Sequence, residues 1–138
     1  MSFLIDTCAL SELTRNKPSP LVSEWLDGTP AESLHVSVLT LGEIRRGVER
    51  LPDSRRRSRI SAWLENELPA WFENRVLPID GSIADEWGRL TARLKNPLPA
   101  IDGLIAATAL CRRLTVVTRN ESDFAPAGVA ILNPWRQR

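Results

Sequence analysis

Short runs of aliphatic and β-branched residues alternate along this chain with longer segments of helical periodicity. The short runs predict strands at residues 2–5, 34–38, 75–79, 115–118 and 129–132. Between them, apolar residues recur at spacings of three and four, the pattern of an amphipathic helix. A regular example is the stripe formed by Leu41, Ile44, Val48 and Leu51. Strands that alternate with helices in this way favour an α/β fold with a parallel sheet.

About six helices should accompany these strands. Four are predicted at residues 7–15, 21–26, 54–68 and 100–114, one carries the stripe described above, and one follows Ser82, which we expect to cap it. Together these elements account for most of the 138 residues. The sequence therefore predicts one domain over residues 1–138, a length at which folding buries roughly two thirds of the surface of the unfolded chain.

The composition argues against several classes of protein. Two cysteines are too few for a disulfide framework, which favours a reduced, cytoplasmic protein. The N-terminus has no basic segment before its first acid, unlike a signal peptide. The longest apolar stretch, residues 103–111, is far shorter than a membrane span. We therefore expect a soluble protein with no membrane association.

Four acids stand at the ends of hydrophobic elements, where a core normally excludes charge. Asp6 follows the first predicted strand, and Glu43 lies in the helix after the second. Asp102 opens an apolar helix, and Asp123 follows the fourth strand. In open parallel sheets, ligands bind beyond the carboxyl ends of the strands, where such acids meet. Two carboxylates about 5 Å apart repel by roughly 3 kcal/mol at an effective dielectric constant near 20. If the fold gathers all four, a cation is needed to hold them.

Three of these acids also have a purely structural explanation. Asp6 can act as the N-cap of the helix that starts at Thr7. Asp123 can start a turn. Glu43 can pair with Arg46 on an exposed helix face, which is worth only a few tenths of a kcal/mol. For each of these residues taken alone, the structural explanation remains open.

Asp102 is harder to explain structurally. It is the only charged residue between positions 101 and 111, in a helix that is apolar or small on nearly every side and is therefore buried. The dipole at a helix N-terminus stabilises an acid by about 0.3–1 kcal/mol. Burial of an unpaired carboxylate costs several kcal/mol, so the dipole alone is insufficient.

Glu43 has an unusual neighbour. It lies off the apolar stripe, and Gly47 follows one turn later on the same face. A glycine inside a helix costs about 1 kcal/mol relative to alanine. A need for space beside Glu43, for a ligand such as a nucleic-acid backbone, would explain this glycine.

The types of residue available decide between metals. An acidic site without histidine or a cysteine knuckle suits Mg²⁺ or Mn²⁺ rather than zinc. Such ions activate a water and stabilise the leaving oxygen in phosphodiester cleavage. Residues 45–59 also contain seven arginines against two acids. These arginines can follow a phosphate backbone or form a solvated helix surface, and the sequence leaves both explanations open.

Short motifs around the four acids occur in an order typical of a known family. They are Leu-Ile-Asp-Thr at 4–7, Leu-Gly-Glu-Ile at 41–44 with Gly47, Asp102 with the segment 104–109, Thr-Arg-Asn at 118–120 with Asp123 and Phe124, and Asn-Pro-Trp at 133–135. With these motifs, which extend over essentially the whole chain, the sequence resembles the PIN domain family, in its VapC-like and FitB-like toxin branch.

The resemblance implies a Rossmann-like three-layer α/β/α sandwich with a five-stranded parallel sheet, in which the first and fourth strands are neighbours. It also implies a small cognate antitoxin that blocks the active site. Assembly as a homodimer or as a hetero-oligomer with the antitoxin would follow, with operator DNA contacted only through the antitoxin.

The resemblance further implies a Mg²⁺- or Mn²⁺-dependent endoribonuclease. Asp6 and Asp102 match the primary metal ligands, and Glu43 and Asp123 match the acids that complete the catalytic pocket. The polar positions that orient these acids correspond to Thr7, Thr118 and Asn120. One position departs from the pattern, because Cys8 stands where the family commonly has Asn or Ser, and a thiol is a poorer hydrogen-bond partner.

Three other functions were weighed against this one. A receiver-type signalling module needs paired acids after the first strand and a lysine near the last, and no lysine follows Lys95. A haloacid-dehalogenase-type phosphatase expects Asp-x-Asp, but Cys8 occupies the second acidic position. A catalytically silent PIN-fold protein that seats an antitoxin on DNA is left open, as are the RNA target and the choice of metal.

Overall fold

A five-stranded parallel sheet organises the computed structural model, which describes residues 1–136. Its strands are β1 (Phe3–Ile5), β2 (Leu34–Ser37), β3 (Val76–Leu77), β4 (Thr115–Val117) and β5 (Ile131–Leu132). They lie in the order β3-β2-β1-β4-β5, and every neighbouring pair is parallel. The expected parallel sheet, with the first and fourth strands adjacent, is confirmed.

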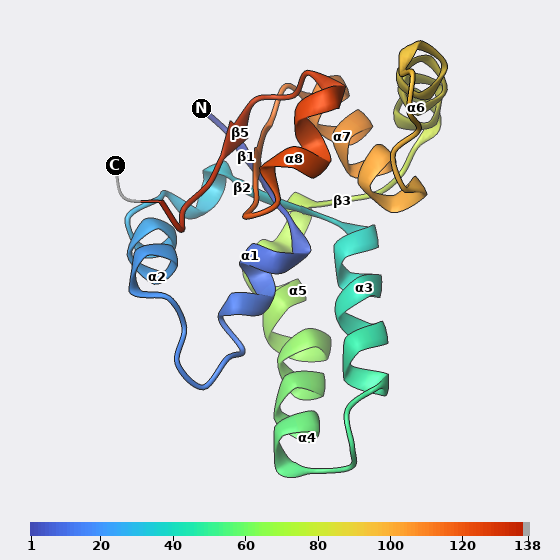
Figure 1. Ribbon diagram of the computed structural model, residues 1–138. Helices are drawn as coiled ribbons and strands as arrows, with labels where there is room; N and C mark the ends of the chain where they lie inside the picture. Colours follow the sequence, from blue (N-terminus) through green and yellow to red (C-terminus); the bar gives the residue numbers. More distant parts are fainter. Residues whose placement is uncertain (137–138) are drawn as a thin grey trace.

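Helices cover both faces of this sheet, as Figure 1 shows. The first layer contains α1 (Thr7–Glu12), α2 (Pro20–Asp27), α3 (Val38–Glu49), α4 (Arg55–Ala62) and α5 (Leu68–Phe72). The second contains α6 (Gly81–Arg93), α7 (Ala100–Arg112) and α8 (Glu121–Phe124). Short 3-10 turns occupy Ala31–Ser33, Glu73–Arg75 and Ala125–Ala127. The three-layer α/β/α architecture is therefore confirmed.

The central strands are apolar throughout because they face a core on each side. In β1, Phe3 and Ile5 point to the first helical layer, while Leu4 points to the second. In β4, Val117 points to the first helical layer and Val116 to the second. Side chains alternate between the two faces of a strand, so a strand buried on both faces reads as a continuous apolar run.

The predicted helix 54–68 continues beyond Pro69 to Phe72. The backbone widens into a π-helical turn at Trp63–Glu67 before α5 begins. Proline has no N–H, and its ring clashes with the carbonyl four residues earlier. A single π-helical turn inside an α-helix is a known accommodation of such a break. The helix therefore persists, and both Leu68 and Phe72 reach the core.

Two other predicted helix boundaries are wrong. Ser82 does not cap α6; Asp80 does, because its Oδ1 accepts the Ile83 amide at 3.0 Å. Asp80 Oδ2 also accepts Arg112 Nη2 at 3.0 Å, so this cap joins the start of α6 to the end of α7. The first helix ends at Glu12 rather than at residue 15, since the next three amides bond to carbonyls three residues earlier, which tightens its last turn.

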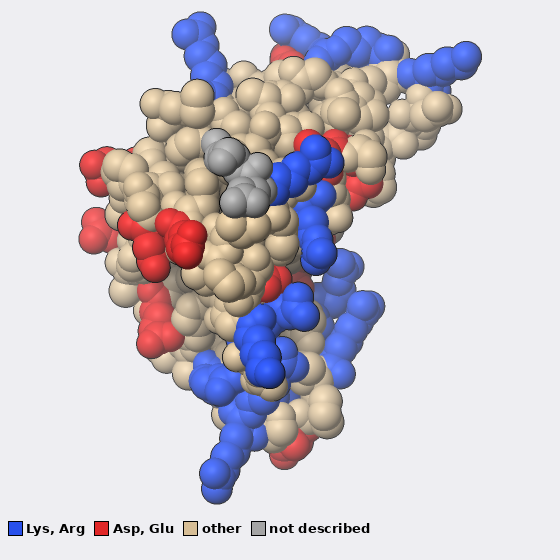
Figure 2. Space-filling view, turned by 60° about the vertical axis from the view of Figure 1, so that its left-hand side comes forward, with Lys and Arg blue, Asp and Glu red and all other residues tan. Residues whose placement is uncertain are grey.

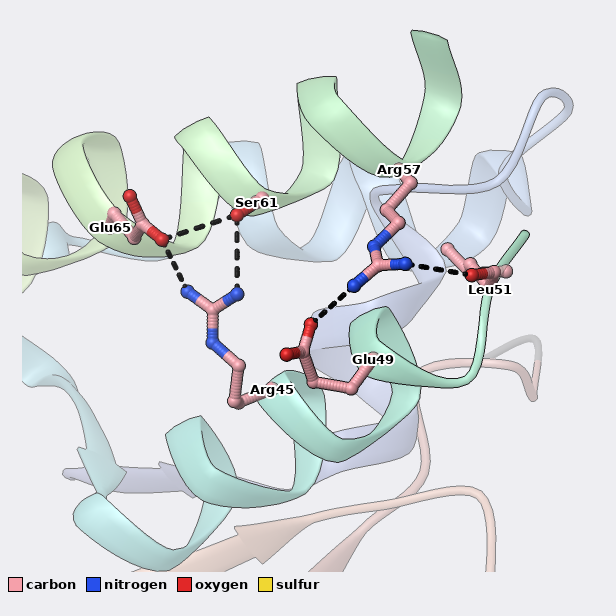
Figure 3. A network of polar contacts seen from close by, with 6 residues as sticks. All are labelled: Arg45, Glu49, Leu51, Arg57, Ser61 and Glu65. Atoms are coloured by element: carbon pink, nitrogen blue, oxygen red, sulfur yellow. Dashed lines mark hydrogen bonds and ion pairs between the residues drawn. The ribbon is translucent and has the colours of Figure 1, made fainter. Parts of the chain in front are cut away.

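Helices α3 and α4 run side by side as an antiparallel hairpin, which two arginines hold together (Figure 3). Arg45 donates to Glu65 Oε1 at 2.7 Å and to Ser61 Oγ at 3.2 Å. Arg57 donates to Glu49 Oε2 at 2.8 Å. Exposed ion pairs are worth about 0.2–1 kcal/mol each, so these contacts mainly fix the relative position of the two helices.

Helices α6 and α7 approach closely at Gly103. A Cβ placed on this glycine would lie 3.1 Å from Nε1 of Trp87. The absence of a side chain at position 103 therefore lets α6 pack against the start of α7, where Asp102 is located. Among the helices of residues 1–136, none is both long and apolar enough to cross a membrane.

The neighbouring aromatic residues Trp71 and Phe72 provide a test of this packing. Phe72 is 1% exposed, whereas Trp71 is 47% exposed. We expect Phe72→Ala to lower the free energy of unfolding by about 3–5 kcal/mol, because it leaves a cavity under the sheet. Trp71→Ala should cost about 1 kcal/mol or less, since it removes only surface contacts. Urea denaturation measures both values, and equal losses would contradict this assignment of the core.

Candidate active site

Asp6 is a buried acid at the carboxyl end of the central strand β1. Its side chain is 6% exposed. Its backbone occupies the N-cap position of α1, and its carbonyl accepts the amides of Ala9 and Leu10. Its carboxylate, however, makes no capping hydrogen bond. Capping therefore does not explain why this position carries an acid.

The carboxylate of Asp6 is held by side chains from two segments. Thr118, which follows β4, donates from Oγ1 to Asp6 Oδ2 at 2.9 Å, and the Asn120 amide donates to Thr118 Oγ1 at 3.0 Å. Cys8 Sγ lies 3.5 Å from Asp6 Oδ2 and accepts the Arg119 amide at 3.4 Å. Burial raises the pKa of the Cys8 thiol, which keeps it protonated as a donor. Cys8 therefore supports Asp6, although through longer bonds.

Glu43 approaches the same site from α3. Its Oε1 accepts the Thr7 hydroxyl at 2.5 Å, which joins α3 to the start of α1. The ion pair with Arg46 that the sequence suggested is present but long, at 3.7 Å. Glu43 is therefore fixed mainly by Thr7, and its side chain is only 21% exposed.

Asp102 lies in the first turn of α7 and is half-buried. Within residues 1–136, no cation forms an ion pair with it. Burial and, to a smaller extent, the negative charges of Asp6, Asp123 and Glu43 together raise the pKa of Asp102 to about 6. The other three predicted acids therefore lie close enough to Asp102 to affect its titration.

The four acids are not equivalent. Burial also raises the pKa of Asp6, while the hydrogen bond from Thr118 opposes this effect. Asp123, on α8, is exposed to solvent, and within the described residues it has no ion pair. Asp6 and Asp102 therefore form the inner part of the site, and Asp123 lies at its rim.

The donor atoms at this site fit a hard divalent cation. Carboxylate and hydroxyl oxygens surround it, and Asp102 forms no ion pair in the part of the chain that the structure describes. Within residues 1–136, no group of three or more acidic, histidine or cysteine side chains is already arranged to hold a metal ion. Mg²⁺ commonly binds through one or two carboxylates and retains several waters, which matches a pair such as Asp6 and Asp102.

The three predicted supporting residues all contact the site. Thr7 bonds to Glu43 and Thr118 bonds to Asp6 through their hydroxyl groups. Asn120 acts through its backbone amide, and within residues 1–136 its side chain makes no hydrogen bond. The backbone contact of Arg119 with Cys8 was not predicted, because no side-chain pattern reveals it.

A fifth acid, Glu12, is also buried but has a structural role. It is 5% exposed, and its carboxylate accepts the Ser19 amide at 2.8 Å and Arg15 Nη1 at 3.3 Å. These bonds close the loop between α1 and α2. Sequence analysis did not identify Glu12 as buried, because the bond from Ser19 depends on the path of that loop.

Comparison with known proteins gives consistent matches over nearly the whole chain. Residues 3–128 match the sequence model of the PIN domain. The Toxin FitB of Neisseria gonorrhoeae is 36% identical over 135 residues, covering 96% of this chain and 97% of that protein. The VapC ribonuclease Y4jK of Sinorhizobium fredii is also 36% identical over 135 residues, covering 96% of each.

Solved structures agree in fold. A crystal structure of FitAcB from Neisseria gonorrhoeae superposes with a TM-score of 0.92 at 35% identity, covering 98% of this chain and 99% of that chain. A structure of FitAB bound to an IR36 DNA fragment gives a TM-score of 0.92 at 32% identity, covering 99% and 97%. The match over residues 3–128 includes all four acids of the site. The chain belongs to the PIN domain family.

Proposed function

We propose that this chain is a Mg²⁺- or Mn²⁺-dependent endoribonuclease that acts as the toxin of a toxin–antitoxin pair. The relatives that are named toxins and ribonucleases support the class of activity. The observation that carries the chemistry is Asp102, a half-buried acid without a counter-charge whose pKa is raised to about 6 by burial and by three other acids. Such a group stays ionised at neutral pH most favourably when a cation binds beside it.

In this proposal Asp6 and Asp102 are the primary metal ligands, and Glu43 and Asp123 complete the acidic pocket directly or through water. A divalent ion held there would supply an activated water and stabilise the charge on the leaving oxygen of an RNA phosphodiester. The chain's own contribution is to position oxygen atoms in advance of binding, which is the main requirement of such a site.

The surrounding residues orient these oxygens. Thr118 and Cys8 both contact Oδ2 of Asp6, and the backbone of Thr7 gives this carboxylate a further hydrogen bond. Thr7 occupies Oε1 of Glu43 and leaves Oε2 beside Arg46, 3.7 Å away. Asp6 and Glu43 are therefore both held by hydrogen bonds within the fold before any ion binds.

We further propose a small antitoxin as the partner of this chain. The FitAcB crystal structure and the DNA-bound FitAB structure support this assignment, because each matches nearly all of this chain with a TM-score of 0.92. In the resulting assembly, which contains a homodimer or a hetero-oligomer with the antitoxin, operator DNA is contacted through the antitoxin.

The first test removes the proposed metal ligands. Asp6→Asn and Asp102→Asn keep the size of each side chain but remove its charge, so each should reduce Mg²⁺-dependent cleavage of RNA by about 100-fold or more. Asp85→Asn, on the exposed face of α6, serves as the matched control and should cleave normally. Gel analysis of RNA with Mg²⁺, and with excess EDTA, measures these rates. Full activity of either site variant, or of wild type in EDTA, would refute the mechanism.

The second test concerns stability and pH in the absence of metal. Asp102 has a folded pKa of about 6 against 3.8 for the ordinary group. The folded chain therefore binds a proton that the unfolded chain has released, and stability falls as the pH rises from about 3.8 to about 6. The Asp102→Asn variant has no group that titrates at this position. As the pH rises through that window, the free energy of unfolding of wild type should therefore fall relative to that of the variant.

Urea unfolding in EDTA at several pH values measures the free energy of unfolding of wild type and of Asp102→Asn. Contributions from the titration of other groups largely cancel in the difference between the two values. Added Mg²⁺ should stabilise wild type near neutral pH more than it stabilises the variant, because a ligand that binds only the folded state raises its stability. A difference between the two proteins that is independent of pH would show that Asp102 does not titrate as described.

A further inference from the structure

A groove extends from the acidic site along the first helical layer. It has a volume of about 200 Å³ and passes between the end of α1 and the α3–α4 hairpin. Its polar lining consists of Ser11, Thr14, Glu43, Gly47 and Arg56. One end is therefore the carboxylate of Glu43 in the proposed active site, and the other is an arginine at the start of α4.

A second hollow, lined mainly by cationic residues, adjoins this groove at Arg56. This second hollow, of about 500 Å³, is lined by Arg15, Asn16, Lys17 and Arg56. Arg56 borders both spaces, so the groove beside Glu43 and the hollow beside Lys17 are neighbours at this arginine. Figure 2 shows Lys and Arg side chains gathered over the lower part of the molecule, where Figure 1 places the connection between α3 and α4.

The cations beside the groove and the hollow differ from those that hold the hairpin together. Arg45 and Arg57 are engaged with acids across the hairpin (Figure 3). Within residues 1–136, Lys17 and Arg56 are exposed and form no ion pair. Their charges are therefore available to a ligand that enters the groove.

Gly47 lies beside this groove, in the middle of α3. A Cβ placed at this position would meet no atom within 4 Å, so no contact inside the described chain requires a glycine. Glycine is nevertheless unfavourable in the middle of a helix. Because Gly47 lines the groove one turn from Glu43, an alanine or larger residue would project its side chain toward the open space.

We propose that this groove binds the sugar–phosphate backbone of the RNA on one side of the cleaved bond, with Lys17 and Arg56 contacting its phosphates. The inference rests on the proposed function, since it places the scissile phosphate beside Glu43. Arginine presents a planar fork of donors that fits a phosphate group, and backbone contacts of this kind fix position without reading sequence. The hydroxyls of Ser11 and Thr14 offer further donors along the groove.

An acidic polypeptide is the alternative occupant of a cationic groove. The position of the groove favours RNA, because its lining includes both Arg56 and Glu43, one of the acids proposed to cleave a phosphodiester. The open space at Gly47 lies between the cations and those acids, where a continuous nucleic-acid strand has to pass. A peptide bound only to Lys17 and Arg56 has no need of that space.

The proposal is tested with a variant in which Lys17→Gln and Arg56→Gln are combined. Binding of a fluorescent single-stranded oligoribonucleotide of mixed sequence is measured by anisotropy in EDTA at several salt concentrations. The logarithm of the RNA affinity falls linearly with the logarithm of the salt concentration. Each lost phosphate contact should make this slope less steep by about 0.7. The control combines Arg89→Gln and Arg93→Gln on α6, which removes the same charge from the other layer and should leave the slope nearly unchanged.

Two outcomes would overturn the proposal. The first is an RNA affinity and salt slope that equal those of wild type. The second is a loss of binding to poly-L-glutamate without a loss of binding to RNA, which would assign the groove to an acidic polypeptide. Wild-type cleavage of RNA with Mg²⁺ is measured in parallel. Absence of that cleavage would refute the proposed function, whereas unchanged RNA binding by the groove variant would refute only this inference.

Gly47 allows a second, separate test. Gly47→Gln should raise the midpoint of urea unfolding, because it removes a glycine from a helix, and should at the same time weaken RNA binding. Gly88→Gln is the matched control, since Gly88 is also an exposed helical glycine with no atom within 4 Å of a Cβ. The control should gain stability and bind RNA normally. Normal RNA binding by Gly47→Gln would contradict the proposed path.

Discussion

The hydrogen bond from Thr118 to Asp6 joins the ends of the two central strands, and the rest of the site is arranged around it. β1 and β4 pair in parallel with Ile5 beside Val117, so the next residue of each strand meets the other. The Asp6 amide also donates to the Val117 carbonyl at 2.9 Å, which fixes the backbone at the same point. Because both strands are covered on both faces, the Asp6 carboxylate at their ends is buried.

The two kinds of buried acid in this fold show what distinguishes a functional carboxylate from a structural one. Glu12 has a backbone amide and an arginine as partners, and it closes a loop. Asp102 has no cation beside it and lies within the field of three other acids. A carboxylate in that position lowers the stability of the metal-free fold. No ion pair within residues 1–136 offsets this loss, which is consistent with our proposal that a cation binds beside Asp102.

Much of the fold could be predicted because it depends on periodicity, which is a local property. The five strands, the parallel sheet and the meeting of the four acids follow from apolar runs and from the geometry of parallel strands. The cap at Asp80, the π-helical turn before Pro69 and the burial of Glu12 did not follow. The cap and the π-helical turn depend on which of two similar local conformations is the more stable. The burial of Glu12 depends on how the loop after α1 is placed in the folded chain.

The arginines of the α3–α4 hairpin occupy two different environments in the structure. Arg56 and Arg57 are successive residues, which a helix separates by about 100°. Arg57 turns toward α3 and pairs with Glu49, while Arg56 lines the groove beside Gly47. Arg57 thus holds the hairpin together, whereas Arg56, which forms no ion pair within residues 1–136, lies beside the same groove as the helical glycine Gly47. That division is expected of a helix that must both hold its partner helix and leave charge available to a ligand.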